Sequence, residues 1–168
     1  YALHASTGTH IWNFTTFGRI LESSPTVVGN IIYIGSEDNR VYALNASTGV
    51  HIWNFTGLSS FASSSPAVGR GILYITETNN RTYALNASTG THIWNFTASA
   101  INTQIAQPPA LTNNVVFVAG QDRRIYALNS TTGQHLWNYT TGDIIRSAPA
   151  VANGYVYVGS YDGKLYAF

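Results

Sequence analysis

The chain has 168 residues, of which 45% are hydrophobic and 9% are charged, and its net charge is +1. This length and apolar content are typical of a single domain, residues 1–168, and the near-zero charge does not favour binding to nucleic acid or to an anionic membrane. The absence of cysteine excludes disulfides, thiolate metal sites and cysteine nucleophiles, and no apolar run approaches the roughly 20 residues of a membrane span. Because the chain opens on Tyr1 and not on Met, we expect a processed product or a segment of a longer protein.

A repeated pattern of residues dominates the sequence. Copies begin at Tyr1, Tyr42, Tyr83 and Tyr126, and a partial fifth copy begins at Tyr166. The starts are 41, 41, 43 and 40 residues apart, which is the period of a propeller blade. Repeats of this kind bury their apolar faces against neighbouring repeats.

One repeat, residues 23–56, shows the elements of the unit in chain order. Residues 23–28 are expected to form a first strand, with Pro25 near its start, where a missing N–H is tolerated. The β-prone residues 31–36 and 40–44 predict second and third strands, with turns before each. Residues 45–49 predict a hairpin loop, and residues 51–56 alternate bulky and smaller side chains as a fourth strand.

The fold expected from these repeats is all-β, a β-propeller of four four-stranded antiparallel blades. The last three expected strands, residues 147–168, lack an outer strand that residues 10–15 could supply. Pairing of the N- and C-terminal strands would then close a ring and remove its edges. Residues 1–3 have no slot in that scheme.

The loop and fourth strand carry a family resemblance. The pattern Ala-Leu-Asn-Ala-Ser-Thr-Gly-x-His-Ile-Trp at residues 43–53 closely resembles the tryptophan-docking motif of pyrroloquinoline quinone (PQQ)-type propeller repeats. Residues 147–151 (Ser-Ala-Pro-Ala-Val) and 156–160 (Val-Tyr-Val-Gly-Ser) resemble two further strands of that family. The resemblance implies that one tryptophan per repeat packs between adjacent blades: Trp12, Trp53, Trp94 and Trp137.

The chain also departs from the family that it resembles. Family members usually have seven or eight blades, so three arrangements remain open: a four-bladed ring, an eight-bladed ring of two chains, or a polymer joined through terminal strands. Quinone-binding members use a vicinal cysteine pair and a calcium ion held by acidic and amide side chains, and neither can be placed here. The resemblance therefore implies no cofactor and is closer to scaffold members, which include an outer-membrane assembly lipoprotein that binds partners through propeller loops.

Asn-x-Ser/Thr sequons are the strongest chemical signal. Three of them arise where the family's motif Asp is replaced by Asn, in hairpin loops that meet solvent. The expected N-linked glycan sites are Asn13, Asn45, Asn54, Asn80, Asn86, Asn95, Asn129 and Asn138. The simpler alternative is an Asx-turn residue in each hairpin.

The charged residues follow a pattern as well. Of the fifteen (eight basic, seven acidic), all but Arg70 lie in loops between blades or in turns after second strands. In a propeller these loops share one end of the ring, so we expect a charged, partner-binding face, unless turns simply tolerate charge. Besides Glu77, its members are Arg19, Glu22, Glu37, Asp38, Arg40, Arg81, Asp122, Arg123, Arg124, Asp143, Arg146, Asp162 and Lys164.

Catalysis finds little support in the sequence. The repeated histidines at positions 10, 51, 92 and 135 fall on outer strands, too far apart to share a metal ion, and packing beside the tryptophan is expected instead. No nucleophile elbow, zinc motif or phosphate loop is present. Glu22, Gln104 and Arg146 are the polar residues expected near the axis, and they offer no pair of catalytic acids.

We therefore expect a non-enzymatic, exported glycoprotein at the cell surface or outside the cell. Its expected role is that of a structural, self-assembling subunit whose partner is itself or another surface protein, with filaments formed by terminal strand exchange. The alternative is a protein- or glycan-binding module of a larger extracellular protein. A quinone or sugar enzyme is a third class, and it would need a ligand in the central channel.

Overall fold

The computed structural model describes residues 1–99 and 106–168, and these residues form seventeen β-strands in five antiparallel sheets. The chain opens with a hairpin of β1 (Ala2–Leu3) and β2 (His10–Trp12).

Three blades and a terminal sheet follow the hairpin. Blade I comprises β3 (Thr26–Val28), β4 (Ile31–Gly35), β5 (Arg40–Asn45) and β6 (His51–Thr56). Blade II comprises β7 (Ala67–Gly69), β8 (Ile72–Thr76), β9 (Arg81–Asn86) and β10 (His92–Thr97). Blade III comprises β11 (Ala110–Leu111), β12 (Val115–Ala119), β13 (Arg124–Asn129) and β14 (His135–Thr140). The terminal sheet comprises β15 (Ala150–Ala152), β16 (Tyr155–Gly159) and β17 (Leu165–Ala167).

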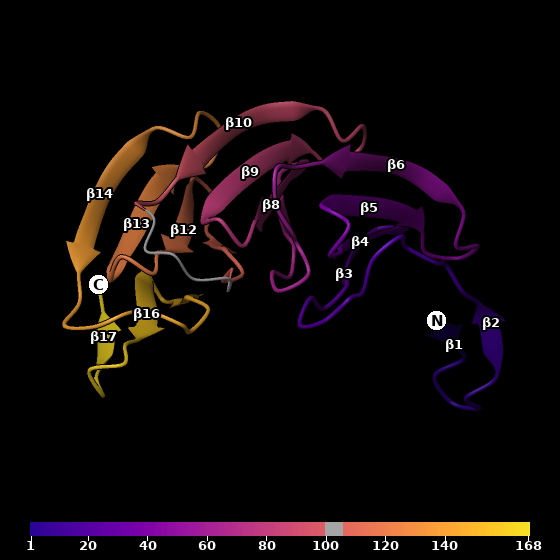
Figure 1. Cartoon of the computed structure of the whole chain (residues 1–168), viewed down its shortest axis with the longest axis horizontal. Coiled ribbons are helices and arrows are strands. Elements are labelled where there is room, and N and C mark those ends of the chain that lie inside the picture. The colour runs from indigo at the N-terminus through magenta and orange to yellow at the C-terminus, as the bar shows by residue number, and fades with distance from the viewer. Residues whose placement is uncertain (100–105) are drawn as a thin grey trace.

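The sheets follow one another along an open arc, with the β1–β2 hairpin and the terminal sheet at opposite ends (Figure 1). The all-β prediction and the four-stranded antiparallel blade are confirmed. The number of complete blades differs from the prediction, since three sheets of the described chain have four strands. The pairing of terminal strands within one sheet is not made, because β2 pairs with β1 and not with β17.

Each pair of neighbouring blades is joined by a tryptophan of one blade that docks on a hairpin of the next. The Trp53 indole Nε1 donates a hydrogen bond to the Ala87 carbonyl at 3.1 Å, and the Tyr33 hydroxyl donates to the same oxygen at 3.0 Å. The Trp94 indole and the Tyr74 hydroxyl share an equivalent carbonyl in blade III. Buried apolar side chains fill the space beneath each of these contacts.

The glycine of each docking hairpin leaves room for the indole. Gly90 has a φ of +73°, and a Cβ there would lie 2.5 Å from the Trp53 ring. A Cβ at Gly49 would likewise clash with the Trp12 ring, and a Cβ at Gly133 would clash with the Trp94 ring. The first hairpin repeats this turn at Gly8, with a φ of +69°, but a Cβ there meets nothing within 4 Å.

We expect Gly90→Ala to destabilise the protein by ~2–4 kcal/mol, because it adds a steric clash with Trp53 to the strain of the left-handed turn. Gly8→Ala is the matched control at the same position of the repeat, and we expect it to cost ~1 kcal/mol from turn strain alone. Urea unfolding of the two variants at a concentration where the chain is monomeric measures the difference. Equal losses would contradict the docking role of the glycine.

Candidate functional site

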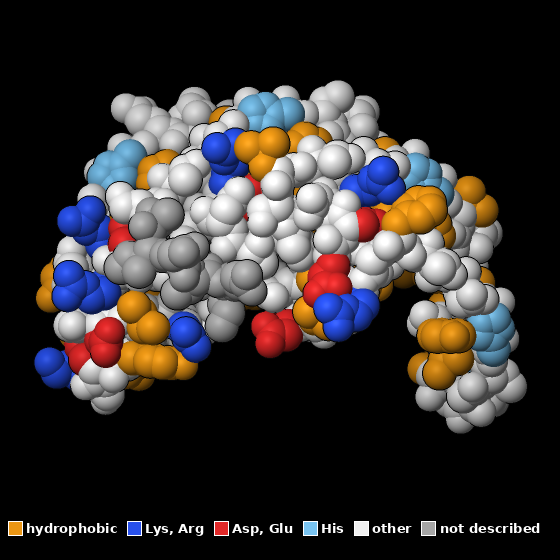
Figure 2. Space-filling model, viewed as in Figure 1, with side chains coloured by type: hydrophobic (Ala, Val, Ile, Leu, Met, Phe, Trp, Pro, Cys, Tyr) orange, Lys and Arg blue, Asp and Glu red, His pale blue; other side chains and the backbone are white. Residues whose placement is uncertain are grey.

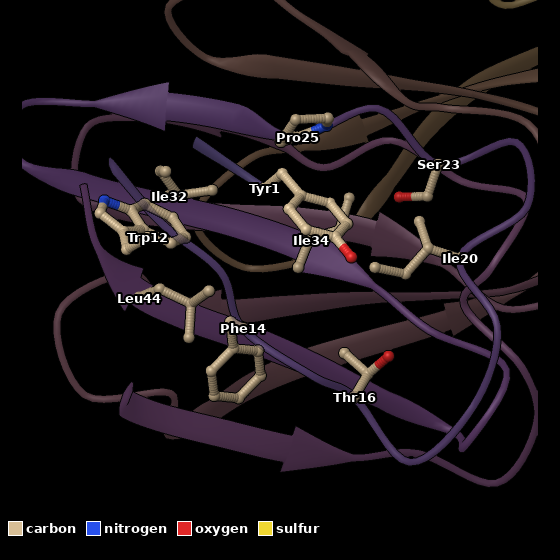
Figure 3. Close-up of a pocket in the computed structure, with 10 residues that line it drawn as sticks. All are labelled: Tyr1, Trp12, Phe14, Thr16, Ile20, Ser23, Pro25, Ile32, Ile34 and Leu44. Atoms are coloured by element: carbon tan, nitrogen blue, oxygen red, sulfur yellow. The ribbon is translucent and has the colours of Figure 1, made fainter. Parts of the chain in front are cut away.

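Two apolar hollows, one near each end of the arc, are the first candidate sites. The face at the N-terminal end belongs to blade I and holds a pocket of about 190 Å³, with the side chains of Ile32, Ile34 and Leu44 on its floor (Figure 3). Trp12 and Phe14 line its side, and Tyr1 lies over it. Trp12 makes the usual docking contact, since its indole donates to the Ala46 carbonyl at 3.1 Å.

The same face is covered at the interior interface. The blade II equivalents of Ile34 and Leu44 are Ile75 and Leu85, and both are fully buried against blade I. In blade I, Ile34 (6% exposed), Tyr42 and Leu44 (4% exposed) are also buried, in a small cluster with Trp12 and Phe14 packed at its side. The β1–β2 hairpin and the residues that follow it therefore already cover much of this face, and the pocket is the space that they leave.

The other hollow lies between blade III and the terminal sheet. Its volume is about 560 Å³, and it is lined by Trp137, Tyr139, Tyr155, Phe168 and neighbouring residues. Leu165 in β17 is 75% exposed, whereas its equivalent Val41 in blade I is fully buried. The C-terminal end therefore presents one side of a blade interface.

Trp137 lies between blade III and the terminal sheet, but it is docked less completely than the other tryptophans. It contacts Phe117 and Phe168, with ring centroids 5.9 and 6.1 Å away, but it is 38% exposed. Within the described residues, no hairpin carbonyl accepts a hydrogen bond from its indole, in contrast to Trp12, Trp53 and Trp94. The reason is that no docking hairpin follows the terminal sheet in this structure.

Charged side chains lie across the face of the arc seen in Figure 2. Many of the acidic ones are engaged within the fold. Asp38 accepts hydrogen bonds from the Phe17 and Arg40 backbone N–H groups and from the Tyr42 hydroxyl. Asp122 and Asp162 make the equivalent turn and tyrosine contacts. These acids hold turns together, as the simpler reading of the charge pattern expects.

The basic side chains of this face divide into bound and available groups. Arg19 forms a salt bridge with Glu37, with Nε and Oε2 2.7 Å apart. Arg81 and Arg124 donate to threonines of the neighbouring outer strands. The basic residues Arg123 and Lys164 are exposed, and so are the acidic residues Glu22 and Asp143. Arg146 lies over the Tyr161 ring at 5.3 Å, and Gln104, expected near it at the axis, lies outside the described residues.

In blade II, the acidic residue of the turn between the second and third strands is replaced by an asparagine. Asn79 stands where the other repeats have Asp38, Asp122 and Asp162. Glu77, two residues earlier and fully buried, accepts hydrogen bonds from the Leu58 and Ser59 backbone N–H groups in its place. The charge pattern alone did not single out this residue, although the missing acid at position 79 is a signal in the sequence that could have done so.

The buried tyrosines give the fold a dependence on high pH. Burial raises the pKa of Tyr33, Tyr42, Tyr74, Tyr83 and Tyr126 above the ordinary value of 10.0. Because the unfolded chain then ionises at lower pH than the folded one, stability is full below pH 10.0 and is lost as the pH rises through the folded pKa values. We expect the urea midpoint to change little up to about pH 10 and to fall as the pH rises above it. An unchanged midpoint over that range would contradict this account.

The sequons fall into three environments. On the outer strands Asn54, Asn95 and Asn138 are exposed, and each Nδ2 lies 3.0–3.1 Å from the Nε2 of a histidine three residues earlier. Asn13 follows β2 and is also exposed.

The hairpin asparagines Asn45, Asn86 and Asn129 form Asx turns. Each Oδ1 atom accepts hydrogen bonds from two backbone N–H groups. Among the described residues, their Nδ2 atoms make no hydrogen bond. Asn80 differs, because it is 4% exposed and lies in a turn with a φ of +64°.

We expect glycan occupancy to follow these environments. In a glycosylating host, Asn54, Asn95 and Asn138 should be modified and Asn80 should not, because a glycan needs an amide that reaches solvent. Peptide mass spectrometry of the secreted protein measures the occupancy of each site. Occupied Asn80 together with unoccupied outer-strand sites would contradict the prediction.

The repeated histidines pack against rings other than tryptophan. His51 stacks on Phe14 at 6.2 Å and meets Tyr42 edge-on, and His92 repeats both contacts with Phe55 and Tyr83. Across residues 1–99 and 106–168, no three histidine or acidic side chains come together in a way that could hold a metal ion. No helix in the described part of the chain is suited to cross a lipid bilayer.

Together, the stacked antiparallel sheets and their tryptophan docking define a β-propeller repeat protein. The sequence matches the protein family described as outer membrane protein assembly factor BamB over residues 1–95 and again over residues 59–168. The chain therefore belongs to the PQQ-like, BamB-type β-propeller repeat family.

Solved structures agree with this assignment. BamB from Moraxella catarrhalis is 26% identical with a TM-score of 0.76, over 83% of this chain and 46% of that one, so this chain spans about half its length. The computationally designed Ika8 protein is 15% identical with a TM-score of 0.84, over 99% of this chain and 51% of the design. The designed Ika4 protein is 18% identical with a TM-score of 0.73, over 92% and 94% of the two chains. None of the curated proteins compared with this chain matches it.

Proposed function

We propose that this chain is a non-enzymatic, exported glycoprotein of the cell surface or extracellular space, and that it assembles with further copies of itself as a structural subunit. The observation that carries the proposal is the pair of open blade faces. Within residues 1–168, Trp137 has no docked hairpin, and the Gly8 hairpin has no docked tryptophan. These two surfaces are complementary, so a second copy of the chain could cover both of them.

The curvature of the arc supports a closed assembly. The whole arc superposes on about half of the Ika8 chain with a higher TM-score than it reaches on nearly all of the shorter Ika4 chain. A ring of two copies is therefore one assembly that the curvature of the arc allows. A ring of two copies has two identical head-to-tail interfaces and leaves no open blade face.

Sedimentation velocity over a dilution series tests self-association. We expect the sedimentation coefficient to rise with protein concentration towards a plateau. A single species with the coefficient of one chain at every concentration would reject the proposal and would favour a monomeric binding module.

That second candidate rests on exposed apolar side chains beside the charged turns. Phe17, Leu58 and Tyr161 are each more than half exposed, and Arg40 lies over the Phe17 ring at 5.3 Å. Apolar groups among charges are typical of protein-binding surfaces. A binding module would use this face while staying monomeric.

A further inference from the structure

We infer that the turns between blade III and the terminal sheet bind an acidic segment of a partner protein. Arg123 would contact the carboxylates of that segment, and Tyr161, with Arg146 over its ring, would contact an apolar side chain. These residues lie on either side of the loop 141–146, at a junction whose two sides both belong to this chain. The inference goes beyond self-assembly and does not depend on it, because it needs no second copy.

The backbone of Arg123 has a conformation that arginine rarely adopts. Its φ is +69°, in the left-handed region. The other repeats have Asn39, Asn80 and Gly163 at this position, and asparagine and glycine tolerate such a φ. Non-glycine residues in this region are concentrated at ligand-binding sites, where the strain is retained for the sake of a contact. Blade III therefore carries a strained side chain that calls for a functional reason.

Arg70 shows what such an arginine does when its contacts lie within the chain. It also has a positive φ, +55°, at a turn position where two other repeats have Asn113 and Asn153. Its Nη1 donates to the Asn113 carbonyl at 2.8 Å and to Asn114 Oδ1 at 2.6 Å, which joins blade II to blade III. Arg123, by contrast, is exposed, and within the described residues its guanidinium makes no hydrogen bond, ion pair or ring contact. We therefore place its contact in a partner.

The loop 141–146 holds the two sides of this surface in place. The backbone N–H of Thr141 donates to the Arg123 carbonyl at 2.7 Å, and its hydroxyl donates to the same oxygen at 2.9 Å. On the other side, the backbone N–H of Tyr161 donates to the Ile144 carbonyl at 3.0 Å. Because the backbone is fixed before a partner binds, less conformational entropy is lost on binding.

Tyr161 and Arg146 form the second part of the surface. Tyr161 is 60% exposed, and the Arg146 guanidinium lies over its ring at 5.3 Å. The Arg146 Nε atom is buried without a hydrogen-bond acceptor among the described residues, so the internal contacts of this guanidinium are incomplete. Tyrosine and arginine are enriched among the residues that dominate protein–protein binding, which favours a protein segment as the occupant.

The carboxylates near this junction leave the Arg123 charge unpaired. Residues 120–164 contain three acidic residues, Asp122, Asp143 and Asp162, and each accepts at least one hydrogen bond from the fold. In the described part of the chain, none of them forms a salt bridge with Arg123. Lys and Arg side chains gather over the end of the arc where Figure 1 draws β13 and β16 (Figure 2). A carboxylate is the complementary group, because it can accept two parallel N–H donors of one guanidinium.

Fluorescence anisotropy with a labelled peptide tests the inference. The probe is a fluorescein-labelled peptide of glutamates around one leucine, and the same peptide with glutamines in place of the glutamates is the control ligand. We expect saturable binding of the glutamate peptide to the unsubstituted chain, weakened by added salt, and no binding of the glutamine peptide. Equal binding of the two peptides, or binding of neither, would overturn the inference.

Arg123→Asn removes the guanidinium and inserts the residue that blades I and II have at this turn. We expect it to weaken binding of the glutamate peptide roughly 10-fold, while the urea midpoint stays the same or rises because the strain is relieved. Arg70→Asn is the matched control, and we expect it to leave binding unchanged and to lower the urea midpoint, since its contacts with blade III are lost. Loss of binding in both variants, or in neither, would overturn the role of Arg123.

Tyr161→Thr tests the apolar contact, and it inserts the residue that blade II has at Thr78. We expect it to weaken binding of the leucine-containing peptide more than binding of the same peptide with serine in place of leucine. Equal losses with the two peptides would overturn the contact of Tyr161 with an apolar side chain.

Two further results separate the alternatives. Binding of heparin, a sulfated polysaccharide, that is weakened by Arg123→Asn, with no binding of the glutamate peptide, would overturn the choice of a protein segment. Sedimentation of the chain alone tests self-assembly. A chain that stays single would reject self-assembly and leave peptide binding standing, whereas a chain that associates but binds no peptide would overturn this inference alone.

Discussion

Trp53→Ala is expected to lower the free energy of unfolding by ~3–5 kcal/mol, one of the largest losses from a single substitution in this chain. The substitution empties a site that is 7% exposed, removes the hydrogen bond to Ala87 and uncovers Gly90. Urea unfolding followed by circular dichroism measures the loss.

Trp137→Ala is the matched control for Trp53→Ala. Because Trp137 is 38% exposed and lacks a docked hairpin, we expect less than half of the Trp53 effect in the monomer. Losses of the same size at both positions would mean that the ring contacts with Phe117 and Phe168 already provide the full docking energy, and the description of an open face would be wrong.

Glu77→Ala is expected to destabilise the protein by ~2–4 kcal/mol, because two backbone N–H groups lose a charged acceptor at a buried position. Asn79→Asp should recover most of that loss in the double variant. The reason is that Asp38 and Asp162 already serve the equivalent N–H groups from this place in the repeat, those of Phe17 and Gly142. Thermal unfolding of the two variants and of the parent checks both steps.

The rescue separates hydrogen bonding from packing. Failure of Asn79→Asp to restore stability, with a normal fold, would show that Glu77 acts by filling space between Gly57 and Phe61 and not as an acceptor for the loop.

The repeat period and local turn chemistry predicted much of the fold. Within one repeat, the four expected strands over residues 23–56 correspond to β3 to β6, because alternation, Asn-rich turns and glycine act over short distances. The docking of Trp12, Trp53 and Trp94 was implied by the resemblance of the hairpin motif to the PQQ-type repeat family. These features depend on each repeat and its immediate neighbour.

Closure could not be predicted in this way. Tyr1-Ala2-Leu3 and Tyr166-Ala167-Phe168 are equivalent segments, so local preference does not decide which of them pairs with β2. The structure pairs β2 with β1 and leaves Trp137 half-open. The choice depends on competition between two edges far apart in the chain, and in an assembly it depends on concentration as well.

The candidate surfaces were predicted in part. The charged turns were found from the sequence, but the use of Asp38, Asp122 and Asp162 as turn and tyrosine acceptors needed coordinates. The apolar floor of Ile32, Ile34 and Leu44 looks like any other blade core in the sequence. It becomes a candidate site because the β1–β2 hairpin leaves a pocket over it in this structure.

The native molar mass in solution, measured by light scattering with the glycan mass determined alongside, tests the central claim most directly. Our account predicts species of two or more chains, with a protein mass that is a multiple of 18.2 kDa. A protein mass of 18.2 kDa over the whole accessible concentration range would contradict it, because the chain would then not associate with further copies of itself.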